Sequence, residues 1–485
     1  MITTMMTEKD WAAHNVRRKN LGAHVLGVTA FAGGRISTHW LMPNGQIAQD
    51  NWDMDGMEFP SLTAELPEVA WDEREIHDMF GYRPKGHLDL RALVRNPRWP
   101  DGFYPLAGLN APRKPQWLEV APNNPAQTVE GEGVTIMKVG PTHAGIIEAG
   151  HFVFSIIGEN ILHVDLHLFQ NHRGVEGQLQ GRPIGSVCPI ISRICGADTV
   201  SHQTNLAMAV EEMVGYQVPD EIQWQRILLL ESERILSHLN DLAQIPAGVG
   251  FSVANQRALA MKERWQRGLD VIFGHRLLFD TVQAGKPLDM DTQALGTLIV
   301  QLQREWRPWR SLVQGHHGFQ DRMQGVGTVR QSDALRFGGQ GIVARASGVT
   351  FDARQQMPLY QSWHVDYASE ASGDVFSRFK VRLDEVEASW RLMERVLQRI
   401  QIHSALPVWE PPPDLAGQAV TFSESPHGLN AHIVAVDRGQ VIRYHVRSGT
   451  FRNWPLLAKA VAGNAVGDFP LINKSFELCY SCLDR

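Results

Sequence analysis

Residues 193–202 read R-I-C-G-A-D-T-V-S-H and contain Cys195 and Asp198, two side chains that can bind a metal ion. If this segment opens a helix, side chains three positions apart project from the same face of that helix. A thiolate and a carboxylate placed in this way lie close enough to bind one metal ion. The segment therefore predicts half of a metal site at the start of a helical region.

A second pair of potential ligands lies at the far end of the chain. Residues 476–485 read F-E-L-C-Y-S-C-L-D-R, so Cys479 and Cys482 repeat the same spacing. One C-x-x-C motif is a weak signal, but two such pairs at opposite ends of a long helical region indicate a shared site. The alternative is that Cys195 is a small buried hydrophobic residue and the terminal pair a surface dithiol, because free cysteine commonly fills a core.

The composition excludes several classes of function. The chain has 485 residues, with 46 basic and 52 acidic side chains, a net charge of −6 and no long run of either sign. Binding to nucleic acid or to an anionic membrane surface is therefore not expected. A chain of this length predicts about two to four domains.

The expected cellular compartment follows from the cysteine content and from the lack of a sequence pattern for a signal peptide or a membrane span. Four cysteines in a chain of this size argue for a reducing compartment rather than a disulfide framework. The N-terminus has no basic segment followed by an apolar run, so we expect no signal peptide. No stretch approaches the ~20 consecutive apolar residues that a membrane span needs. We therefore expect a cytoplasmic protein whose contact with a membrane is made through partners.

The first 106 residues predict a small α+β domain. Residues 25–30 and 36–41 have the composition of strands, and Gly33 and Gly34 form a turn signal between them. Residues 107–132 contain four prolines and resist regular structure, so we interpret them as a linker.

Residues 133–485 predict a mainly helical domain that begins with an antiparallel sheet. Apolar residues alternate from 134 to 175 around a Gly158 turn, which is typical of a hairpin or a small sheet. Four long amphipathic segments follow, at residues 202–216, 222–242, 255–278 and 383–403. The expected fold class is therefore α+β.

The motifs of the N-terminal domain resemble those of a known family. E-R-E-x-x-D-M-F-G begins at Glu73, H-x-D-L-R begins at His87, and Trp99 and the pair Tyr104–Pro105 follow. This order is similar to the C subunit of respiratory complex I and of the related energy-converting hydrogenases. By residue type alone, the charges of residues 73–78 fit either a helix end that docks on another subunit or a solvated turn.

The second domain resembles the large subunit of the group 4 nickel-iron hydrogenases of the formate hydrogenlyase type. The resemblance rests on R-I-C-G-x-D-x-x-x-H, the terminal C-x-x-C and five further motifs, which are G-P-x-H (140–143), R-G-x-E (173–176), R-A-S-G (345–348), D-x-R (352–354) and G-D-x-x-x-R (373–378). The D subunit of complex I is the metal-free relative of this family. The resemblance covers nearly the whole chain.

The resemblance implies a metal centre with one altered ligand. In the family, four cysteines hold nickel, and the second cysteine of each pair also bridges an iron that carries cyanide and carbon monoxide. Cys195 and Cys479 would then be terminal nickel ligands, Cys482 a bridging ligand, and Asp198 would occupy the other bridging position. Because carboxylate is a harder ligand than thiolate, the substitution lowers affinity for soft metals. A variant nickel-iron centre, a single nickel or zinc ion and an empty site all remain open.

Two further residues are implied as catalytic. Glu176 matches the glutamate of R-G-x-E, which in the family takes a proton from a metal-bound thiolate, as general-base chemistry allows. The alternative is a structural ion pair with Arg173 or another arginine. Arg345 matches an arginine that faces the metal cleft, where it polarises a small ligand or, alternatively, holds a carboxylate. His202 is expected to pack within its helix rather than bind metal.

A quinone site is the first rival interpretation. The D subunit of complex I holds its quinone with a histidine and a tyrosine, and Ile147 and Gly196 stand at the corresponding positions here. Without these donors a buried quinone carbonyl would bind weakly. The second rival is a structural coupling subunit with an inactive site.

The expected function is that of the large subunit of a membrane-associated oxidoreductase complex. The chain has too few cysteines to hold an iron–sulfur cluster in addition to the metal site, so a small iron–sulfur partner subunit is implied. The resemblance also implies membrane-embedded subunits that translocate ions. The chain would then lie on the inner face of the cytoplasmic membrane, attached through these partners.

Overall fold

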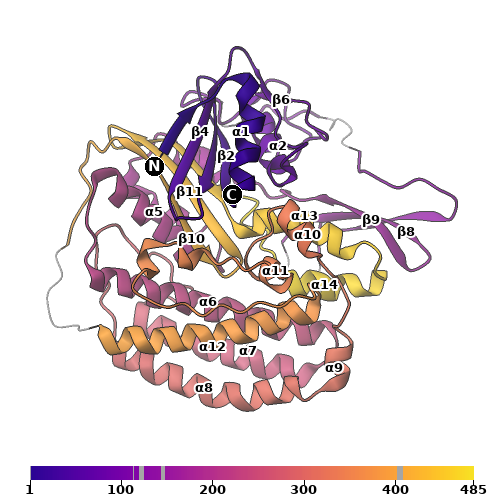
Figure 1. The fold of residues 1–485 in the computed structure, drawn as a ribbon, viewed down its shortest axis with the longest axis vertical. Helices are drawn as coiled ribbons and strands as arrows, with labels where there is room; N and C mark the ends of the chain where they lie inside the picture. Colours follow the sequence, from indigo (N-terminus) through magenta and orange to yellow (C-terminus); the bar gives the residue numbers. More distant parts are fainter. Residues whose placement is uncertain (1, 113, 120–124, 144–147, 401–407) are drawn as a thin grey trace.

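The computed structural model describes residues 2–112, 114–119, 125–143, 148–400 and 408–485, so Ile147 lies outside the described residues. Figure 1 shows an N-terminal sheet at the top of the molecule, a second sheet beneath it, and a layer of long helices at the bottom. The predicted α+β class and the predicted N-terminal sheet are confirmed.

The N-terminal unit is a four-stranded sheet with order β1-β4-β3-β2, covered by two helices. Its strands are β1 (Ile2–Met5), β2 (His24–Phe31), β3 (Arg35–Leu41) and β4 (Ile47–Asp53), and its helices are α1 (Glu8–Asn20) and α2 (Ala70–Phe80). The turn at Gly33 and Gly34 connects β2 to β3 as predicted, and both glycines have positive φ angles. Strands β5 (Glu58–Pro60) and β6 (Arg83–Lys85) pair in parallel beside this sheet. Trp11 of α1 and Trp40 of β3 are fully buried between these layers.

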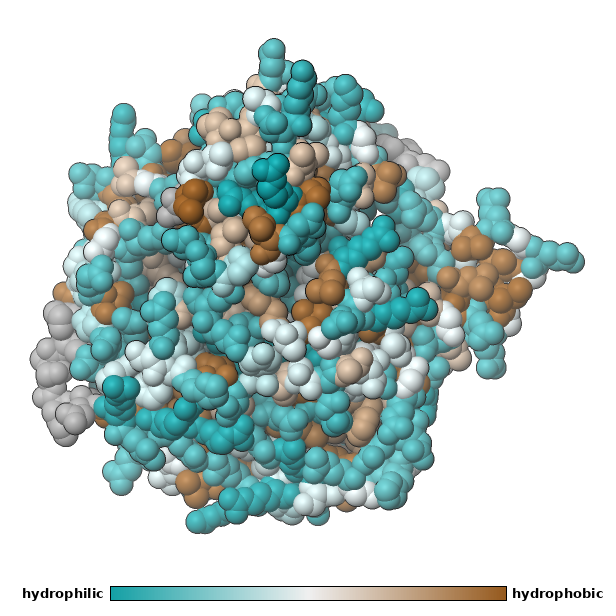
Figure 2. Space-filling view, in the orientation of Figure 1, coloured by the Kyte–Doolittle hydropathy of each residue, from teal (hydrophilic) through white to brown (hydrophobic). Residues whose placement is uncertain are grey.

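The next unit is the antiparallel sheet that the alternating pattern predicted. It consists of β7 (Val134–Val139), β8 (His151–Ile157) and β9 (Asn160–His167), in that order. The sheet projects from the body of the molecule at the right of Figure 1, where Figure 2 shows a hydrophobic patch. The exposed side chains in these strands include Ile136, Ile157 and Leu162.

Four of the long helices lie where amphipathic segments were predicted. They are α5 (Thr199–Val214), α6 (Asp220–Gly248), α7 (Ser252–Phe273) and α12 (Val375–Arg399), and the fifth long helix, α8 (Thr292–Gln314), was not predicted. Leu228, Ile235 and Leu239 of α6 are fully buried, which confirms the apolar face expected for this segment. The shorter helices are α3 (Val175–Leu179), α4 (Cys188–Ile191), α9 (His317–Asp321), α10 (Gln331–Arg336), α11 (Gly341–Ala346), α13 (Gly449–Val461) and α14 (Phe469–Phe476).

A second three-stranded antiparallel sheet in this domain was not predicted. It is formed by β10 (Gly417–Ser425), β11 (Gly428–Asp437) and β12 (Gln440–Arg447) and lies between the N-terminal sheet and the helical layer. Because the sheet is covered on both faces, polar side chains such as Asn430 and His432 are fully buried. These strands therefore lack the apolar–polar alternation by which a half-exposed strand is recognised.

The N-terminal unit is joined to the rest of the molecule by a shared core and by buried ion pairs. Apolar side chains of both parts belong to one continuous hydrophobic cluster. Asp72 of α2 contacts Arg447 at 2.7 Å and Arg452 at 2.5 Å, and all three side chains are at most 2% exposed. Charges this deeply buried are retained only when they are paired, so the two parts depend on each other. The domain boundaries at 106 and 132 remain predictions.

None of the helices in the described part of the chain is both long and apolar enough to cross a membrane.

Candidate metal centre

Three sulfur atoms from the two ends of the helical domain lie together. The sulfur atoms of Cys195, Cys479 and Cys482 are all within 4.8 Å of one another, and those of Cys195 and Cys479 are 3.1 Å apart. Oδ2 of Asp198 lies 3.6 Å from the sulfur of Cys482. Cys195 and Cys482 are buried and Cys479 is half-buried. The structure therefore gathers the three cysteines that the sequence singled out as metal ligands and places the carboxylate of Asp198 beside one of them, Cys482.

Neither ligand pair lies on a helix, which differs from the expectation. Cys195 precedes α5, Asp198 is the N-cap residue of that helix, and a turn at residues 480–484 follows α14. The backbone amides of Leu483 and Asp484 close this turn by donating to the carbonyl of Tyr480. Cys479 immediately precedes the turn and Cys482 lies within it, so the turn brings both cysteines to the site.

Asp198 does not cap its own helix, although it occupies the N-cap position of α5. The carboxylate of Glu233, from α6, accepts hydrogen bonds from the amides of Val200 at 2.6 Å and Ser201 at 3.2 Å. These are the amides that an N-cap side chain ordinarily satisfies. Because Glu233 takes over this role, the carboxylate of Asp198 is free to face the sulfur atoms.

His427 is the ionic partner of Asp198. It lies in the two-residue turn between β10 and β11, and its Nδ1 is 2.9 Å from Oδ1 of Asp198. Burial acts to lower the pKa of His427, but the charge of Asp198, its hydrogen bond and further nearby charges together outweigh burial and raise this pKa to about 10. Burial acts to raise the pKa of Asp198, but the charge and hydrogen bond of His427, together with smaller contributions from His202 and Cys482, outweigh burial and lower that pKa. The pair therefore consists of an imidazolium and a carboxylate near neutral pH.

Arg173 clamps the two segments that carry the cysteines. Its Nη1 donates to the carbonyl of Arg193 at 2.9 Å, and its Nη2 donates to the carbonyls of Ile194 at 2.7 Å and Ser481 at 2.8 Å. Its backbone amide donates to the carbonyl of Asp484 at 2.6 Å. One residue of the R-G-x-E motif thus holds the loop before α5 against the C-terminal turn.

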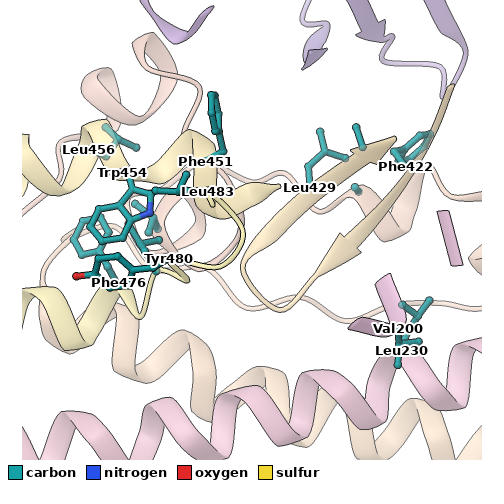
Figure 3. Close-up of a cluster of buried hydrophobic side chains, with 14 of the residues drawn as sticks. Val200, Leu230, Phe422, Leu429, Phe451, Trp454, Leu456, Phe476, Tyr480 and Leu483 are labelled. Carbon is teal, nitrogen blue, oxygen red and sulfur yellow. The ribbon is translucent and has the colours of Figure 1, made fainter. Parts of the chain in front are cut away.

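Apolar contacts anchor the C-terminal turn from its other side. Figure 3 shows Tyr480 and Leu483 among buried side chains that include Trp454 and Phe476. The rings of Tyr480 and Trp454 meet edge to face, with centroids 5.0 Å apart. Leu483 is 1% exposed. Because Cys482 lies between these two anchors, its position in the turn is fixed by packing as well as by hydrogen bonds.

The three thiols of the site differ in the direction of their pKa shifts. Hydrogen bonds from Cys195 and from Cys482 hold the pKa of Cys479 well below its usual value. The hydrogen bond to Cys479 raises the pKa of Cys195, and hydrogen bonds to both other sulfurs raise that of Cys482. Cys479 is therefore the first of the three to become a thiolate, and the thiolate is the form that binds metal.

The donor set fits a metal ion. In a tetrahedral site with metal–sulfur bonds of about 2.3 Å, the sulfur atoms are about 3.8 Å apart. The sulfur separations here, from 3.1 Å to at most 4.8 Å, bracket that value. Oδ2 of Asp198 is next to the sulfur of Cys482, while Oδ1 is engaged by His427. Three thiolates and one monodentate carboxylate would complete four coordination positions.

A cavity of about 280 Å³ with apolar and polar lining reaches the half-buried sulfur. Cys479 and His427 line it, and so does Gly196, the residue that replaces a quinone-binding tyrosine in the rival interpretation. The other polar lining residues are Ser237, Asn240, Asp241, Lys262, Gln266 and Glu477. A small solute can therefore approach the sulfur cluster from the side of α6.

The structure places Glu176 among two arginines and a histidine. Its carboxylate contacts Arg443 at 2.7 Å, Arg485 at 3.1 Å and His445 at 3.2 Å. Burial acts to raise the pKa of Glu176, but the interactions with Arg443, His445 and Arg485 together outweigh burial and hold this pKa well below its usual value. The ion pair that the sequence left open as an alternative therefore exists, with these arginines rather than with Arg173. Proton transfer through Glu176 stays a prediction.

Arg345 lies in a second buried network. Its guanidinium contacts Glu385 at 2.7 Å, Glu424 at 2.8 Å and Asp352 at 3.5 Å, and all four side chains are at most 1% exposed. It also donates to the carbonyl of Phe351 at 3.2 Å. None of these partners is a residue of the sulfur site. Of the two roles that the sequence left open for Arg345, the contacts favour the holding of carboxylates.

His202 connects the surroundings of the site to the second sheet. It lies one turn after Asp198 on α5, and its Nδ1 is 2.9 Å from Nε2 of His432, whose Nδ1 is 2.7 Å from the hydroxyl of Tyr444. Burial lowers the pKa of His202 to about 4. Its Nε2 has no hydrogen-bond partner among the described residues. The ring is therefore a neutral group, held within the core by this chain of hydrogen bonds.

Sequence reasoning missed His427 and the roles of Glu233 and Arg173. His427 occurs in S-P-H-G, a turn signal between two strands, and the strands themselves were not recognised. Glu233 lies in the E-S-E-R stretch of α6 (231–234), whose side chains are all buried, and a buried carboxylate indicates a buried partner. Arg173 belongs to the R-G-x-E motif, in which the glutamate, and not the arginine, was predicted to act at the site.

Family comparisons match three parts of the chain. Residues 42–108 match the model of the respiratory-chain NADH dehydrogenase 30 Kd subunit, residues 173–244 match that of nickel-dependent hydrogenase, and residues 249–414 match that of the respiratory-chain NADH dehydrogenase 49 Kd subunit. The order of these matches confirms the resemblance drawn from the motifs.

Individual relatives show the same combination. The chain is 31% identical to formate hydrogenlyase subunit 5 of Escherichia coli over 458 residues, which covers 89% of this chain and 78% of that protein. It is 30% identical to hydrogenase-4 component G of Escherichia coli, over 89% of this chain and 77% of that one. It is 24% identical to the NADH-quinone oxidoreductase C/D subunit 2 of Aquifex aeolicus, over 88% and 83% of the two chains.

One solved structure shares the fold. A chain of the membrane-bound sulfane sulfur reductase, an archaeal respiratory membrane complex, superposes with a TM-score of 0.68 and 24% identity. The match covers 73% of this chain and 99% of that chain.

Proposed function

Because the chain belongs to the family of formate hydrogenlyase subunit 5 and hydrogenase-4 component G, we propose that it is the large subunit of a membrane-associated oxidoreductase complex. In this role it carries a metal centre at which electrons are exchanged with a substrate. The observation that supports this function is the convergence of three cysteine sulfurs and one carboxylate from opposite ends of the domain.

The proposed cofactor is a variant nickel-iron centre held by Cys195, Cys479, Cys482 and Asp198. The match to the nickel-dependent hydrogenase model and the thiolate-rich donor set support this choice, because soft ligands select soft metals. When bound, the metal supplies Lewis acidity and a change of oxidation state. The protein contributes a pre-assembled donor set, an accessible sulfur at Cys479, and a cavity through which a small substrate enters.

Glu176 and Arg345 have different proposed roles. Glu176 is the proposed proton carrier, because it matches the glutamate of the R-G-x-E motif and a carboxylate beside the site can take up and release a proton. Its link to the site is Arg485, which contacts both the Glu176 carboxylate and the carbonyl of Cys482. Arg345 is proposed to act indirectly, by holding the buried carboxylates of Glu385 and Glu424 in place.

The proposed partners are a small iron–sulfur subunit and membrane-embedded subunits that translocate ions. The relatives that are subunits of membrane-bound complexes support this assembly. All three cysteines of the site are committed to one centre, and Cys188 lies elsewhere, so electrons must arrive through clusters on another chain. In this assembly the chain lies on the inner face of the cytoplasmic membrane and contacts the lipid only through its partners.

The test is metal and infrared analysis of the complex purified with its partners. One nickel per chain, one iron per chain beyond the iron of the iron–sulfur partner, and infrared bands from bound cyanide and carbon monoxide are the expected result. Nickel or zinc alone would reduce the centre to a single ion. A complex that contains neither nickel nor iron at this site and reduces quinone would replace this proposal with the quinone-linked alternative, and a metal-free complex without such activity would identify a coupling subunit.

A further inference from the structure

One ion pair connects the N-terminal domain to the C-terminal turn of the metal centre. Glu75 lies on α2, and its two carboxylate oxygens are 2.9 Å and 3.1 Å from Nη2 of Arg485. The two side chains are 10% and 2% exposed. Charged hydrogen bonds that are shielded from water in this way are stronger and better ordered than those on a surface.

The same guanidinium also holds a proposed metal ligand. Nη1 of Arg485 donates to the carbonyl of Cys482 at 3.2 Å, and Nε donates to Glu176 at 3.1 Å. Each nitrogen of the fork therefore has its own acceptor, two of them carboxylates. A planar guanidinium with all three nitrogens engaged cannot rotate, so the backbone at Cys482 is fixed relative to Glu75.

The surrounding charges show that the Glu75 carboxylate is needed to neutralise the neighbouring arginines. Arg447 also contacts Glu75, at 3.1 Å from the Oε2 atom that pairs with Arg485, and Arg443 pairs with Glu176. Glu75, Glu176 and His445 lie close enough to form a metal site by distance alone. The arginines exclude a cation there, so the cluster is an ion-pair network. Without the Glu75 carboxylate, Arg485 and Arg447 would repel each other, and Arg485 would lose its hold on the terminal turn.

We propose that Glu75 is a positioning residue of the metal centre, through which the N-terminal domain sets the place of Cys482 by way of Arg485. This inference rests on the proposed metal site, but it assigns to the N-terminal domain a part in building that site. The centre would then be complete only when the two domains are docked.

The matched control is Asp72, which is also on α2 and also buried between arginines of the second domain. Asp72 contacts Arg447 and Arg452 but not Arg485. Asp72→Asn therefore removes a comparable interdomain ion pair without touching the link to Cys482. Any effect that is specific to Glu75→Gln cannot come from weaker domain docking alone.

The experiment compares the full-length wild type, Glu75→Gln and Asp72→Asn at a temperature well below the unfolding of each. Nickel(II) affinity is measured by titration, and alkylation of Cys482 by iodoacetamide is followed by mass spectrometry in metal-free protein. We expect Glu75→Gln to bind nickel about 10-fold more weakly, as loss of an outer-shell partner typically does. We also expect it to expose Cys482 to alkylation several-fold faster. Asp72→Asn should match the wild type in both measurements.

The inference would be overturned if Cys482 were alkylated at the same rate in the wild type and in Glu75→Gln. It would also be overturned if Glu75→Gln and Asp72→Asn accelerated this alkylation equally. If Glu75→Gln does not fold, Glu75→Asp replaces it, and unchanged Cys482 reactivity in that folded variant with its shortened carboxylate overturns the inference equally. A wild type that binds no nickel would refute the proposed metal site. The alkylation comparison would still decide whether Glu75 positions Cys482.

Discussion

Oδ1 of Asp198 lies 2.9 Å from Nδ1 of His427, in a buried pair whose members are 229 positions apart. The hairpin turn between β10 and β11 delivers the histidine, and the loop before α5 delivers the aspartate. The site thus unites three segments, since the C-terminal turn supplies two of the sulfurs.

The first prediction concerns the pH dependence of stability. The folded-state pKa of His427 is raised to about 10, so the folded protein binds this proton more tightly than the unfolded chain. The stabilisation is complete below the unfolded value of about 6.5 and is lost as the pH rises toward 10. In metal-free wild type we expect the free energy of unfolding to fall over this range. In His427→Gln it should be about 3 kcal/mol lower at pH 6.5 and should change less with pH. Denaturant titrations at several pH values measure this, and parallel curves for both proteins would contradict it.

The second prediction distinguishes Cys482, a proposed metal ligand, from Cys188, which lies outside the sulfur cluster. Cys482→Ser should weaken nickel binding by more than the about 100-fold that loss of an outer-shell partner can cause, because it removes a ligand. Cys188 is the control, since its sulfur lies near the carbonyl of Val282 and outside the sulfur cluster. Burial raises the pKa of Cys188 to about 11, so its thiol stays protonated. Cys188→Ser should bind nickel as the wild type does. Equal metal binding by Cys482→Ser and wild type would point to an inactive site.

The third prediction tests the clamp formed by Arg173. Lysine keeps the charge but cannot reach three carbonyls at once, so Arg173→Lys should lower nickel affinity about 10-fold and leave the fold intact. Arg182→Lys is the control in the same region, because Arg182 donates only to the carbonyl of Gln178 and is exposed. Isothermal titration and circular dichroism of the three proteins give the comparison. If both lysine variants lose affinity equally, the clamp is not specific.

The fourth prediction concerns Arg345. Arg345→Met removes the cation between two buried carboxylates, and breaking such a network should lower the free energy of unfolding by about 3–5 kcal/mol. Because the partners of Arg345 are not part of the sulfur site, nickel affinity of the folded variant should change less than 3-fold. Arg438→Met, at a side chain that is 92% exposed, should affect neither quantity. A stable Arg345→Met variant that fails to bind nickel would instead place Arg345 at the metal.

Much of the fold follows from local patterns. The Gly33–Gly34 hairpin was predictable from strand-like composition on either side of a glycine turn. The sheet of β7–β9 and four long helices were predictable from the period of their apolar residues. The β10–β12 sheet was not, because its strands bury polar side chains that are paired only across the fold, such as His432 with His202. Burial of a polar side chain depends on its distant partner, and that partner is not visible in a local window of sequence.

The candidate site was predictable for a different reason. Spacing identified Cys195, Asp198, Cys479 and Cys482, since a metal ion limits which residue types can meet. The residues that position them come from elements whose contacts are set by tertiary packing. Glu233 caps a helix that is not its own, and Glu75 reaches the centre from another domain. Nothing in their local sequence specifies these partners.

The cap that Glu233 provides for α5 also determines which side chains position 198 can accept during evolution. Since a carboxylate from α6 already satisfies the start of α5, the side chain at 198 is not constrained by helix formation. Replacement of Asp198 by cysteine would remove the pairing with His427 and the contact of the carboxylate with Cys482, but it would leave the cap of α5 in place. Helix α5 can therefore form with either a hard or a soft ligand at position 198. A change at this one position can alter which metal the fold prefers.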